Sequence, residues 1–257
     1  MKILHIVGGP PSNGAYKGTY ILHQALLDLN IDSNILNDHP QKSLNINNDK
    51  IFYINENAFN KILNIIFVFI EKLIKSIFLK SPRSTFTIGL LGFDITKAKQ
   101  YKDADIIHIH WLSQGFIRLQ SLKKINKPIV WTMRDMWPFT GGSHYTIDFE
   151  KYEANFLSKI IKNFKKKNYK NNIQFVAISE WLKSQAEKSS VLSNYEIKKI
   201  YNNINIKDFE LLNKEKAKSY LEIKTEKKII LFGAQNPQNK RKGWNIFIET
   251  LKKLDKS

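Results

Sequence analysis

Short apolar runs alternate with longer amphipathic stretches along most of the chain. Such runs are typical of strands in a parallel sheet that is covered on both faces. They predict strands at Lys2–Val7, Ser33–Leu36, Ile51–Ile54, Ile106–His110, Ile129–Met133, Phe175–Ile178, Lys198–Ile200 and Lys228–Phe232. Because helical periodicity fills most of the intervals, we expect an α/β fold with a Rossmann-like parallel sheet.

The spacing of these elements divides the chain into parts. We expect a Rossmann-like domain over residues 1–202, a polar, Lys-rich linker over 203–226, and the first strand–helix unit of a second Rossmann-like domain over 227–257. One strand and one helix cannot cover both faces of a parallel sheet. We therefore expect the second Rossmann-like domain to be incomplete in this chain.

The segment Phe59–Leu79 is unusually apolar for a surface helix. Its polar residues Asn60, Asn64, Glu71, Lys72 and Lys75 fall on one helical face. Glu71 and Lys72 interrupt the apolar run before it reaches the roughly 20 residues that a membrane span needs. We expect a helix that exposes its Asn60, Asn64, Lys72 and Lys75 side. It either packs only on its own sheet or also lies on an anionic membrane.

The charge of the chain is strongly positive. Lys and Arg number 41 against 23 Asp and Glu, which gives a formal charge of +18 in 257 residues. Such an excess favours phosphates, nucleic acid or an anionic membrane surface as partners. The lysines are scattered, and the sequence holds no nucleic-acid-binding motif, so we expect no nucleic-acid partner. The absence of cysteine excludes disulfides and thiolate metal sites.

A glycine-rich loop follows the first predicted strand and contains Gly8 and Gly9. Glycine lets the backbone approach a ligand closely, and the start of the next helix attracts phosphate. The spacing GGPPSNG does not match the dinucleotide-binding fingerprint. An ordinary strand–helix connection is therefore the alternative to a phosphate site.

The string Ile106–Phe116 holds two histidines that share one face of a strand. We expect His108 to lie in the interior, and His110 and Trp111 to lie near a cleft beyond the carboxyl end of the strand. A metal site is not expected, since the sequence shows no third ligand near the pair. The acidic string Asp103–Asp105 precedes the strand and predicts a polar turn at the opposite end of the sheet.

The most informative string is Ile129–Thr146, in which a buried strand ends at Arg134 and Asp135. The aromatic, glycine and polar residues that follow are Trp137, Phe139, Gly141, Gly142, His144 and Tyr145. This pattern suits a polar, ring-shaped ligand, with Arg134 binding phosphate and Asp135 holding hydroxyls or taking a proton. In a full-length version of the protein, we expect Asp135→Ala to cut activity strongly with little loss of stability. The alternative is that the aromatic residues are core and that Arg134 and Asp135 form a surface pair.

A fourth string, Phe232–Trp244, places Lys240, Arg241 and Lys242 between a predicted strand and a predicted helix. Cations beside the N-terminus of a helix suit a diphosphate. A solvated basic loop is the alternative.

Four strings, ADIIHIHW, KPIVWTMRDMWPFTGGSHY, FVAISEWL and ILFGAQNPQNKRKGW, occur in this order. Together they resemble glycosyltransferase family 4, especially the branch found in capsule, exopolysaccharide and O-antigen clusters. The resemblance runs to about Leu254, and DMWPFTGG is its most specific part. It implies a GT-B fold of two Rossmann-like domains, the first for the acceptor and the second for the sugar nucleotide. It also implies retention of the anomeric configuration without a metal or a cofactor.

By position, the resemblance places Gly8 and Gly9 near the donor phosphates and the acceptor. It assigns neutralisation of the diphosphate leaving group to Arg241 and Lys242. Arg134 stands where the family usually has His, and arginine cannot act as a base near neutral pH. The pair of glutamates with which the family grips the donor would lie beyond residue 257. We therefore expect a truncated chain without transferase activity of its own.

Two functions are carried forward as hypotheses. The first is a glycosyltransferase that moves a sugar from a nucleotide-sugar donor to a saccharide or lipid-linked acceptor in surface polysaccharide synthesis. The second is a non-catalytic, membrane-associated module that binds glycan or lipid-linked sugar. Either would act in the cytoplasm, with peripheral attachment at the inner face of the cell membrane. The candidate catalytic residues are Asp135, Arg134 and His110, and the candidate substrate-binding residues are Gly8, Gly9, Trp111, Gly141, Gly142, His144, Arg241 and Lys242.

Overall fold

The computed structural model describes residues 1–39, 50–79, 85–148, 155–206, 209–225, 227–234 and 236–254. The chain forms two compact units, Met1–Ile204 and Asn205–Ser257. Each unit is described by itself.

The first unit is built on a seven-stranded sheet in which all neighbouring strands are parallel. The strand order is β3-β2-β1-β4-β5-β6-β7. The strands are β1 (Lys2–Ile6), β2 (Asp32–Asn37), β3 (Ile51–Tyr53), β4 (Ile106–Ile109), β5 (Ile129–Met133), β6 (Ile173–Ala177) and β7 (Ile197–Lys199). The Rossmann-like α/β fold expected from the sequence is therefore confirmed.

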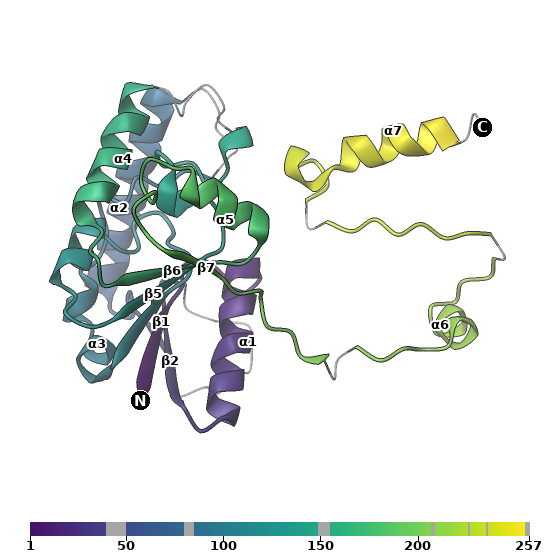
Figure 1. The fold of residues 1–257 in the computed structure, drawn as a ribbon, viewed down its shortest axis with the longest axis horizontal. Helices are drawn as coiled ribbons and strands as arrows, with labels where there is room; N and C mark the ends of the chain where they lie inside the picture. The colour runs from purple at the N-terminus through teal and green to yellow at the C-terminus, as the bar shows by residue number, and fades with distance from the viewer. Residues whose placement is uncertain are drawn as a thin grey trace. The chain divides into compact units, whose positions relative to one another are not determined.

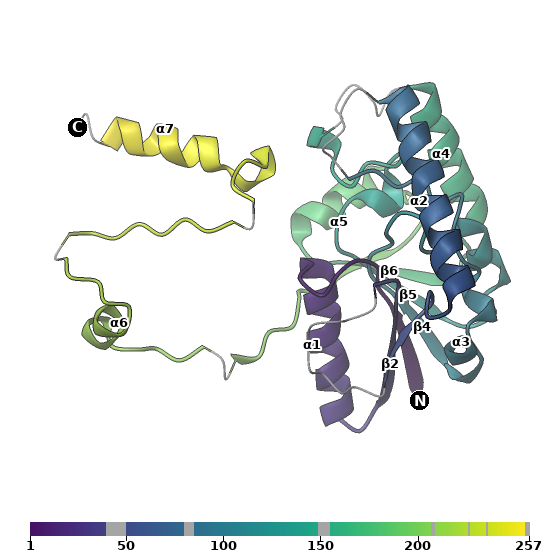
Figure 2. The ribbon, with the colours of Figure 1, turned by 180° about the vertical axis from the view of Figure 1, so that it is seen from behind.

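Helices cover both faces of this sheet. They are α1 (Gly14–Asp28), α2 (Ala58–Phe78), α3 (Lys99–Asp103), α4 (Phe156–Asn168) and α5 (Glu180–Glu187). Figures 1 and 2 show α1 on one face and α2, α3 and α4 on the other. The start of α1 is determined by Asn13, whose side chain accepts a hydrogen bond from the Ala15 N–H and so caps the helix.

The two faces of the sheet differ in chemistry because alternate strand residues point to opposite sides. One face carries the main core, with fully buried Leu4, Ile107 and Trp131 among its residues. The other face, beneath α1, carries His5 on β1 and, directly opposite it in the register, His108 on β4. A polar layer therefore lies on the α1 side, and it approaches the carboxyl ends of the strands.

Helix α2 has the opposite orientation from the one expected. Glu71 is fully buried, and its carboxylate accepts hydrogen bonds from the N–H groups of Ile88 and Gly89 at 3.2 and 3.1 Å. Asn64 donates to the carbonyl oxygen of Gly115 at 3.2 Å. The outward side carries the exposed apolar residues Phe59, Ile62, Ile65, Ile66, Phe69, Leu73, Ile77 and Phe78.

The prediction that Asn60, Asn64, Lys72 and Lys75 form the exposed face is thus wrong except at Lys72, because the other three are only partly exposed. The physical reason is that the segments beneath α2 present backbone groups which need polar partners. Within the described residues, no helix combines the length and the apolar character needed to cross a bilayer.

The second unit contains α6 (Lys214–Tyr220) and α7 (Trp244–Leu254). A strand was expected at Lys228–Phe232, but the described residues of this unit contain none, so that prediction is wrong. A strand needs a neighbour that accepts and donates its backbone hydrogen bonds, and no such neighbour is described here. Leu231 is 92% exposed, whereas the rings of Phe232, Trp244 and Phe247 pack against one another.

Candidate functional site

The predicted site residues of the first unit gather where β1, β4 and β5 end. Gly8 follows β1, His110 and Trp111 follow β4, and Arg134 follows β5. The backbone N–H of Gly8 donates to the carbonyl oxygen of Trp111 at 2.7 Å, which joins two of these loops. Ligands of open α/β sheets bind beyond the carboxyl ends of the strands, so these residues occupy the expected place.

The glycine loop approaches its neighbours so closely that a side chain would not fit. Gly9 has a φ of +85°, and a Cβ there would lie 3.0 Å from the Trp111 ring. Its N–H donates to the Asp38 carboxylate at 2.7 Å. The N–H groups of Gly8 and Gly9 are therefore both bonded within the chain. The expected phosphate cradle is not offered by these two groups in this conformation.

Two residues at the end of β2 hold the glycine loop, and the sequence did not point to them. Asn37 donates through Nδ2 to the carbonyl oxygens of Val7 and Gly9 at 2.6 and 3.0 Å. Asp38 accepts from Gly9 and from the Ser113 hydroxyl. The only sequence signal is an Asn–Asp pair directly after a predicted strand, which is also common in ordinary turns.

Asp135 joins three segments through buried hydrogen bonds. Its Oδ2 accepts from the Trp111 indole N–H at 2.7 Å and lies 2.6 Å from Nδ1 of His144. Its Oδ1 accepts from the N–H of Trp137 at 3.0 Å. With the proton on Nδ1, His144 donates to Asp135 and accepts at Nε2 from the Thr87 hydroxyl at 2.9 Å. Asp135 and His144 therefore act as positioning residues, because their polar atoms are bonded within the chain and both side chains are buried.

The nine candidate residues of the first unit fall into two groups according to their solvent exposure. Trp111 and Arg134 keep partial exposure, whereas Gly8, Gly9, His110, Asp135, Gly141, Gly142 and His144 are buried. A side chain must be reachable to touch a ligand. Trp111 and Arg134 are therefore the members of this set best placed for direct contact.

Arg134 is a cation for which the described residues supply no acidic partner. Its guanidinium lies 3.2 Å from Nδ1 of His110 and donates to the side chain of Asn202. Burial lowers the pKa of Arg134 to about 10, so it stays protonated at neutral pH. The described part of the chain brings no carboxylate into ion-pair distance, because the neighbouring Asp135 pairs with His144 instead. The alternative interpretation, in which Arg134 and Asp135 form a surface pair, is therefore not supported.

The position of Arg134 also depends on a glycine of α1. A Cβ on Gly18 would lie 2.7 Å from a terminal nitrogen of the Arg134 guanidinium. The absence of a side chain at Gly18 therefore lets the guanidinium lie against the helix. Gly18 thus contributes to the position of the positive charge of Arg134.

Three histidines form a cluster beside Arg134. The nearest ring nitrogens of His5, His108 and His110 all lie within 4.8 Å of one another. The expectation that no third ligand lies near His108 and His110 is therefore wrong, because His5 comes from the neighbouring strand. Burial is the main cause that lowers the pKa of all three, that of His108 to about 3, so the rings are neutral.

Most ring nitrogens of this cluster have a hydrogen-bond partner among the described residues. Nδ1 of His5 lies 3.0 Å from Nε2 of His110, and Nε2 of His108 lies 2.8 Å from the Thr132 hydroxyl. The positive charge of Arg134 beside His110 also opposes a divalent cation. Neutral imidazoles are good metal ligands, but several of these ring nitrogens are already engaged in hydrogen bonds.

Gly141 and Gly142 are buried packing residues rather than parts of an open loop. A Cβ on Gly141 would lie 2.6 Å from the Cα of Ser158, and one on Gly142 would lie 2.5 Å from the Phe86 ring. Gly142 has a φ of +120°. The expected direct role of these glycines in substrate binding is thus not supported by their position.

A buried lysine supports the same loop and was missed in the sequence. Lys165 of α4 is fully buried, and it donates to the carbonyl oxygens of Trp137 and Thr140. Its Nζ lies 3.9 Å from the centre of a Trp137 ring. Lys165 therefore fixes the backbone that follows Asp135.

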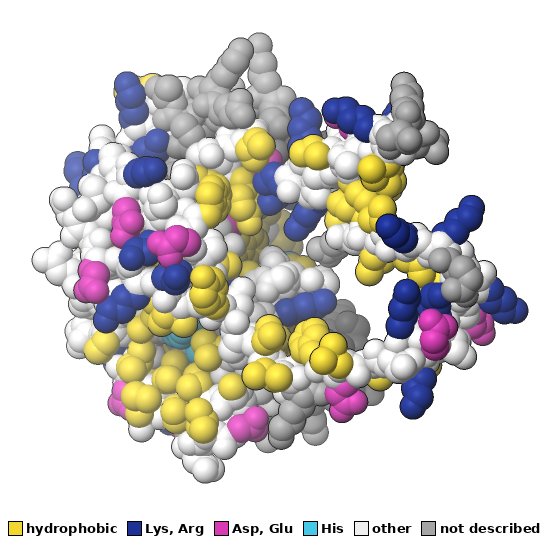
Figure 3. All heavy atoms as spheres, turned by 45° about the vertical axis from the view of Figure 1, so that its right-hand side comes forward, with side chains coloured by type: hydrophobic (Ala, Val, Ile, Leu, Met, Phe, Trp, Pro, Cys, Tyr) yellow, Lys and Arg dark blue, Asp and Glu magenta, His cyan; other side chains and the backbone are white. Residues whose placement is uncertain are grey.

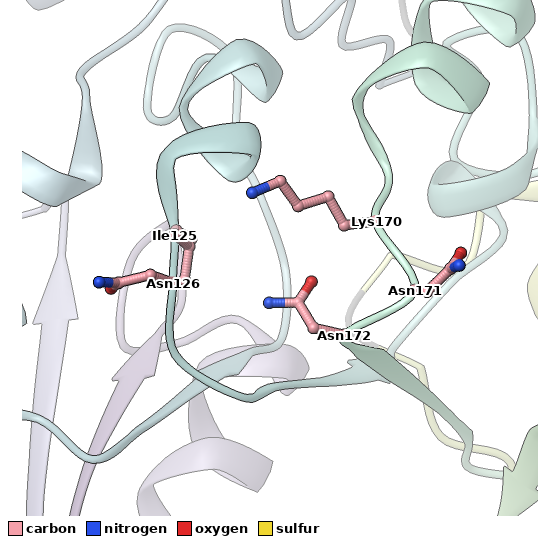
Figure 4. Close-up of a pocket in the computed structure, with 5 residues that line it drawn as sticks. All are labelled: Ile125, Asn126, Lys170, Asn171 and Asn172. Carbon is pink, nitrogen blue, oxygen red and sulfur yellow. The ribbon is translucent and has the colours of Figure 1, made fainter.

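The opposite end of the sheet shows different features. Asp105 accepts from the backbone N–H of Lys2 at 2.7 Å, so the acidic string lies at the amino ends of the strands, as expected. A pocket at this end is lined by Ile125, Asn126, Lys170, Asn171 and Asn172 (Figure 4). Lys170 and Asn172 reach across it in Figure 4, but it lies before β5 and β6 and is far along the strands from the candidate site.

The basic residues of the second unit form a short turn. Lys240–Lys242 is a 3₁₀ turn that begins after Asn239, whose side chain accepts from the N–H of Arg241 at 3.1 Å. Gly243 ends the turn with a φ of +73°, and α7 begins at Trp244. Arg241 and Lys242 thus precede the helix, as expected. Elsewhere on the face shown in Figure 3, Lys and Arg side chains are scattered rather than gathered into one stripe.

No family model matches the sequence, and no curated protein matches it. Among solved structures, the chain is similar to the crystal structure of a glycosyltransferase from Rickettsia africae ESF-5, with a TM-score of 0.45 and 16% sequence identity. The match covers 88% of this chain and 50% of that one. The chain therefore spans about half the length of the structure it matches.

Proposed function

We propose that this chain is the acceptor-side part of a glycosyltransferase. It would move a sugar from a nucleotide-sugar donor to a saccharide or lipid-linked acceptor in surface polysaccharide synthesis. The observation that carries the proposal is the presence of Arg134, for which the described residues supply no carboxylate partner, together with the partly exposed ring of Trp111. Both lie at the carboxyl ends of parallel strands. The family resemblance of the surrounding strings adds support.

The chemistry of the two side chains fits a sugar phosphate. A guanidinium binds phosphate oxygens through two parallel N–H groups, and an aromatic face packs on the apolar side of a sugar ring. Trp111 is held in one orientation because its indole N–H is bonded to Asp135. Arg134 is oriented by His110 and Asn202. The ligand would therefore meet a site that is already ordered.

In the transfer step, the acceptor hydroxyl oxygen bonds to the anomeric carbon while the bond from that carbon to the diphosphate oxygen breaks. The bonding electrons leave with the diphosphate, and the hydroxyl proton passes to one of its oxygens. Arg134 would stabilise the charge that develops on phosphate, which is usually a large part of catalysis. The family resemblance assigns neutralisation of the same leaving-group charge to Arg241 and Lys242. The proposal includes retention of configuration and requires no metal or cofactor.

Ligand binding tests this proposal directly. Titration calorimetry with UDP-, GDP- and TDP-sugars and with polyprenyl-phosphate-linked sugars should reveal a ligand whose affinity falls about tenfold or more in Arg134→Met. Arg118→Met is the matched control, since Arg118 pairs with Asp94 away from the site. Equal affinity of the two variants, or no binding by any of these compounds, would contradict the proposal.

A non-catalytic module that binds glycan or lipid-linked sugar is the second candidate. The observation that favours it is the burial of Asp135 and His144, which leaves no exposed carboxylate or imidazole among the candidate residues. The two candidates differ in turnover. Release of free sugar or transferred product from a bound donor, lost in Arg134→Met, would support the transferase and exclude the module. It would also contradict the expectation that this chain has no transferase activity of its own.

A further inference from the structure

Helix α2 displays a continuous apolar stripe to solvent. The stripe repeats at three- and four-residue intervals, and its central members Ile65 and Phe69 are 67% and 64% exposed. Single exposed apolar residues are ordinary, but a contiguous row marks an interaction surface. At about 1.5 Å per residue, the 21 residues of α2 make a stripe about 30 Å long.

The helix cannot hide this stripe by turning about its axis. Glu71 is bonded to two backbone N–H groups on the inner side, and burial raises the pKa of its carboxyl to about 7. On the same side, Ile74 packs with Leu157 and Ile161 of α4. Rotation would break these bonds and this packing. The outward direction of the apolar stripe is therefore built into the fold.

Helix α4 lies beside α2 and extends the surface. Figures 1 and 2 show the two helices side by side, and they share a small apolar cluster. Phe156 and Ile160 of α4 are 77% and 44% exposed. The exposed apolar residues thus come from two neighbouring helices.

The charges that the two helices themselves expose have one sign. Helix α2 exposes Lys61 and Lys72, and its single acidic residue, Glu71, is buried. Helix α4 contains no acidic residue and exposes Lys159, Lys166 and Lys167. A row of apolar residues bordered by lysines is typical of a helix that lies in the interface of an anionic membrane.

We propose that α2, with the adjoining side of α4, is a docking surface for an anionic lipid bilayer. The apolar stripe enters the boundary between headgroups and acyl chains, and the lysines meet lipid phosphates. A second copy of the chain fits less well, because it carries the same formal charge of +18 and presents the same lysines. This inference does not depend on the transferase proposal, since no residue of the candidate site takes part.

Vesicle flotation tests the surface. The whole chain should float with vesicles of phosphatidylcholine and phosphatidylglycerol and bind much less to phosphatidylcholine alone. Phe69→Asp should lower the partition coefficient about tenfold or more, because an inserted aromatic side chain becomes charged. Lys72→Glu should lower it about fivefold or more, and raised salt should weaken binding further.

Leu29→Asp is the matched control, because Leu29 is 70% exposed at the C-cap of α1 and lies outside the surface. It should leave flotation unchanged, and circular dichroism should show that all three variants fold. Equal flotation of Phe69→Asp and Leu29→Asp would overturn the proposal, as would equal binding to neutral and anionic vesicles. A dimer seen by light scattering and dissolved by Phe69→Asp, without vesicle binding, would also overturn it and assign the surface to a second copy.

Discussion

The buried histidines of the α1 face should make the stability of the protein fall steeply with acid. His5, His23, His108 and His110 are buried or nearly so, and burial is the first cause that lowers the pKa of each. The pKa falls to about 4 for His23 and to about 3 for His108. The folded chain therefore keeps these rings neutral at pH values where the unfolded chain protonates them.

Because these histidine pKa values are depressed by folding, their stabilising contribution is complete above pH 6.5 and is lost as the pH falls below it. When the pH falls from 7 to 5, the unfolded chain gains a proton at each of these histidines, whereas the folded chain does not. Each ring that stays neutral in the folded chain therefore lowers the free energy of unfolding by about 2 kcal/mol. His23 and His108 together lower it by about 4 kcal/mol, and the burial of His5 and His110 acts in the same direction.

Glu71 acts in the opposite direction over the same range. Burial raises the pKa of its carboxyl from 4.5 to about 7, so its contribution is complete at low pH and is lost as the pH rises through 7. Moving from pH 7 to pH 5 therefore restores about 2 kcal/mol. The net loss is therefore at least about 2 kcal/mol, a substantial part of the stability of many domains.

Urea denaturation followed by tryptophan fluorescence at pH 7 and pH 5 measures this loss. His23→Gln should reduce the loss by about 2 kcal/mol. His39→Gln is the control, because His39 is partly exposed and the carboxylate of Asp38 raises its pKa. Equal stability at the two pH values, or the same effect from both variants, would refute the reasoning.

Three further substitutions test the supports of the site. Lys165→Met should lower the unfolding free energy by about 2–4 kcal/mol in urea, because two buried carbonyl oxygens lose their donor. Asp135→Asn should cost about 2–3 kcal/mol in the same assay, since an amide nitrogen cannot accept from Trp111 or His144. Gly18→Ala should displace Arg134 and weaken phosphate-ligand binding about tenfold in calorimetry, without lowering the melting temperature.

The fold could be predicted because the apolar pattern that indicates each strand lies within the residues of that strand. Each apolar run is long enough for one buried strand, and β5 has the bounds Ile129–Met133 that the sequence predicts. Other strands differ by a few residues at their ends, because pairing with a neighbour decides where a ladder stops. The strand expected at Lys228–Phe232 shows the limit of this approach, since an apolar run becomes a strand only beside a partner.

The place of the site could also be predicted, but the accessibility of its side chains could not. Loops after parallel strands converge whatever their sequence. The burial of His144 depends on Thr87, which lies 57 positions away. For this reason the sequence predicted little loss of stability for Asp135→Ala, whereas its buried hydrogen bonds lead us to expect a substantial loss.

Two features could not be predicted from any pattern of neighbouring residues in the sequence. Lys165 is one of several lysines in the last turn of α4. It differs from the others because it packs against Trp137 and is buried there. The inward side of α2 is polar because Ile88 and Gly89 present backbone N–H groups to Glu71. Both depend on contacts between segments that are distant in the sequence.

The central claim is that Trp111 and Arg134 together bind a sugar phosphate. The most direct measurement is a proton–nitrogen NMR titration of the five tryptophan indole groups with nucleotide-sugars and lipid-linked sugars. The Trp111 indole signal, assigned by its loss in Trp111→Phe, should shift on binding, while the signal of the fully buried Trp131 stays in place. The shift should disappear in Arg134→Met. A Trp111 signal that does not respond to any of these ligands, or that responds equally in Arg134→Met, would contradict the account.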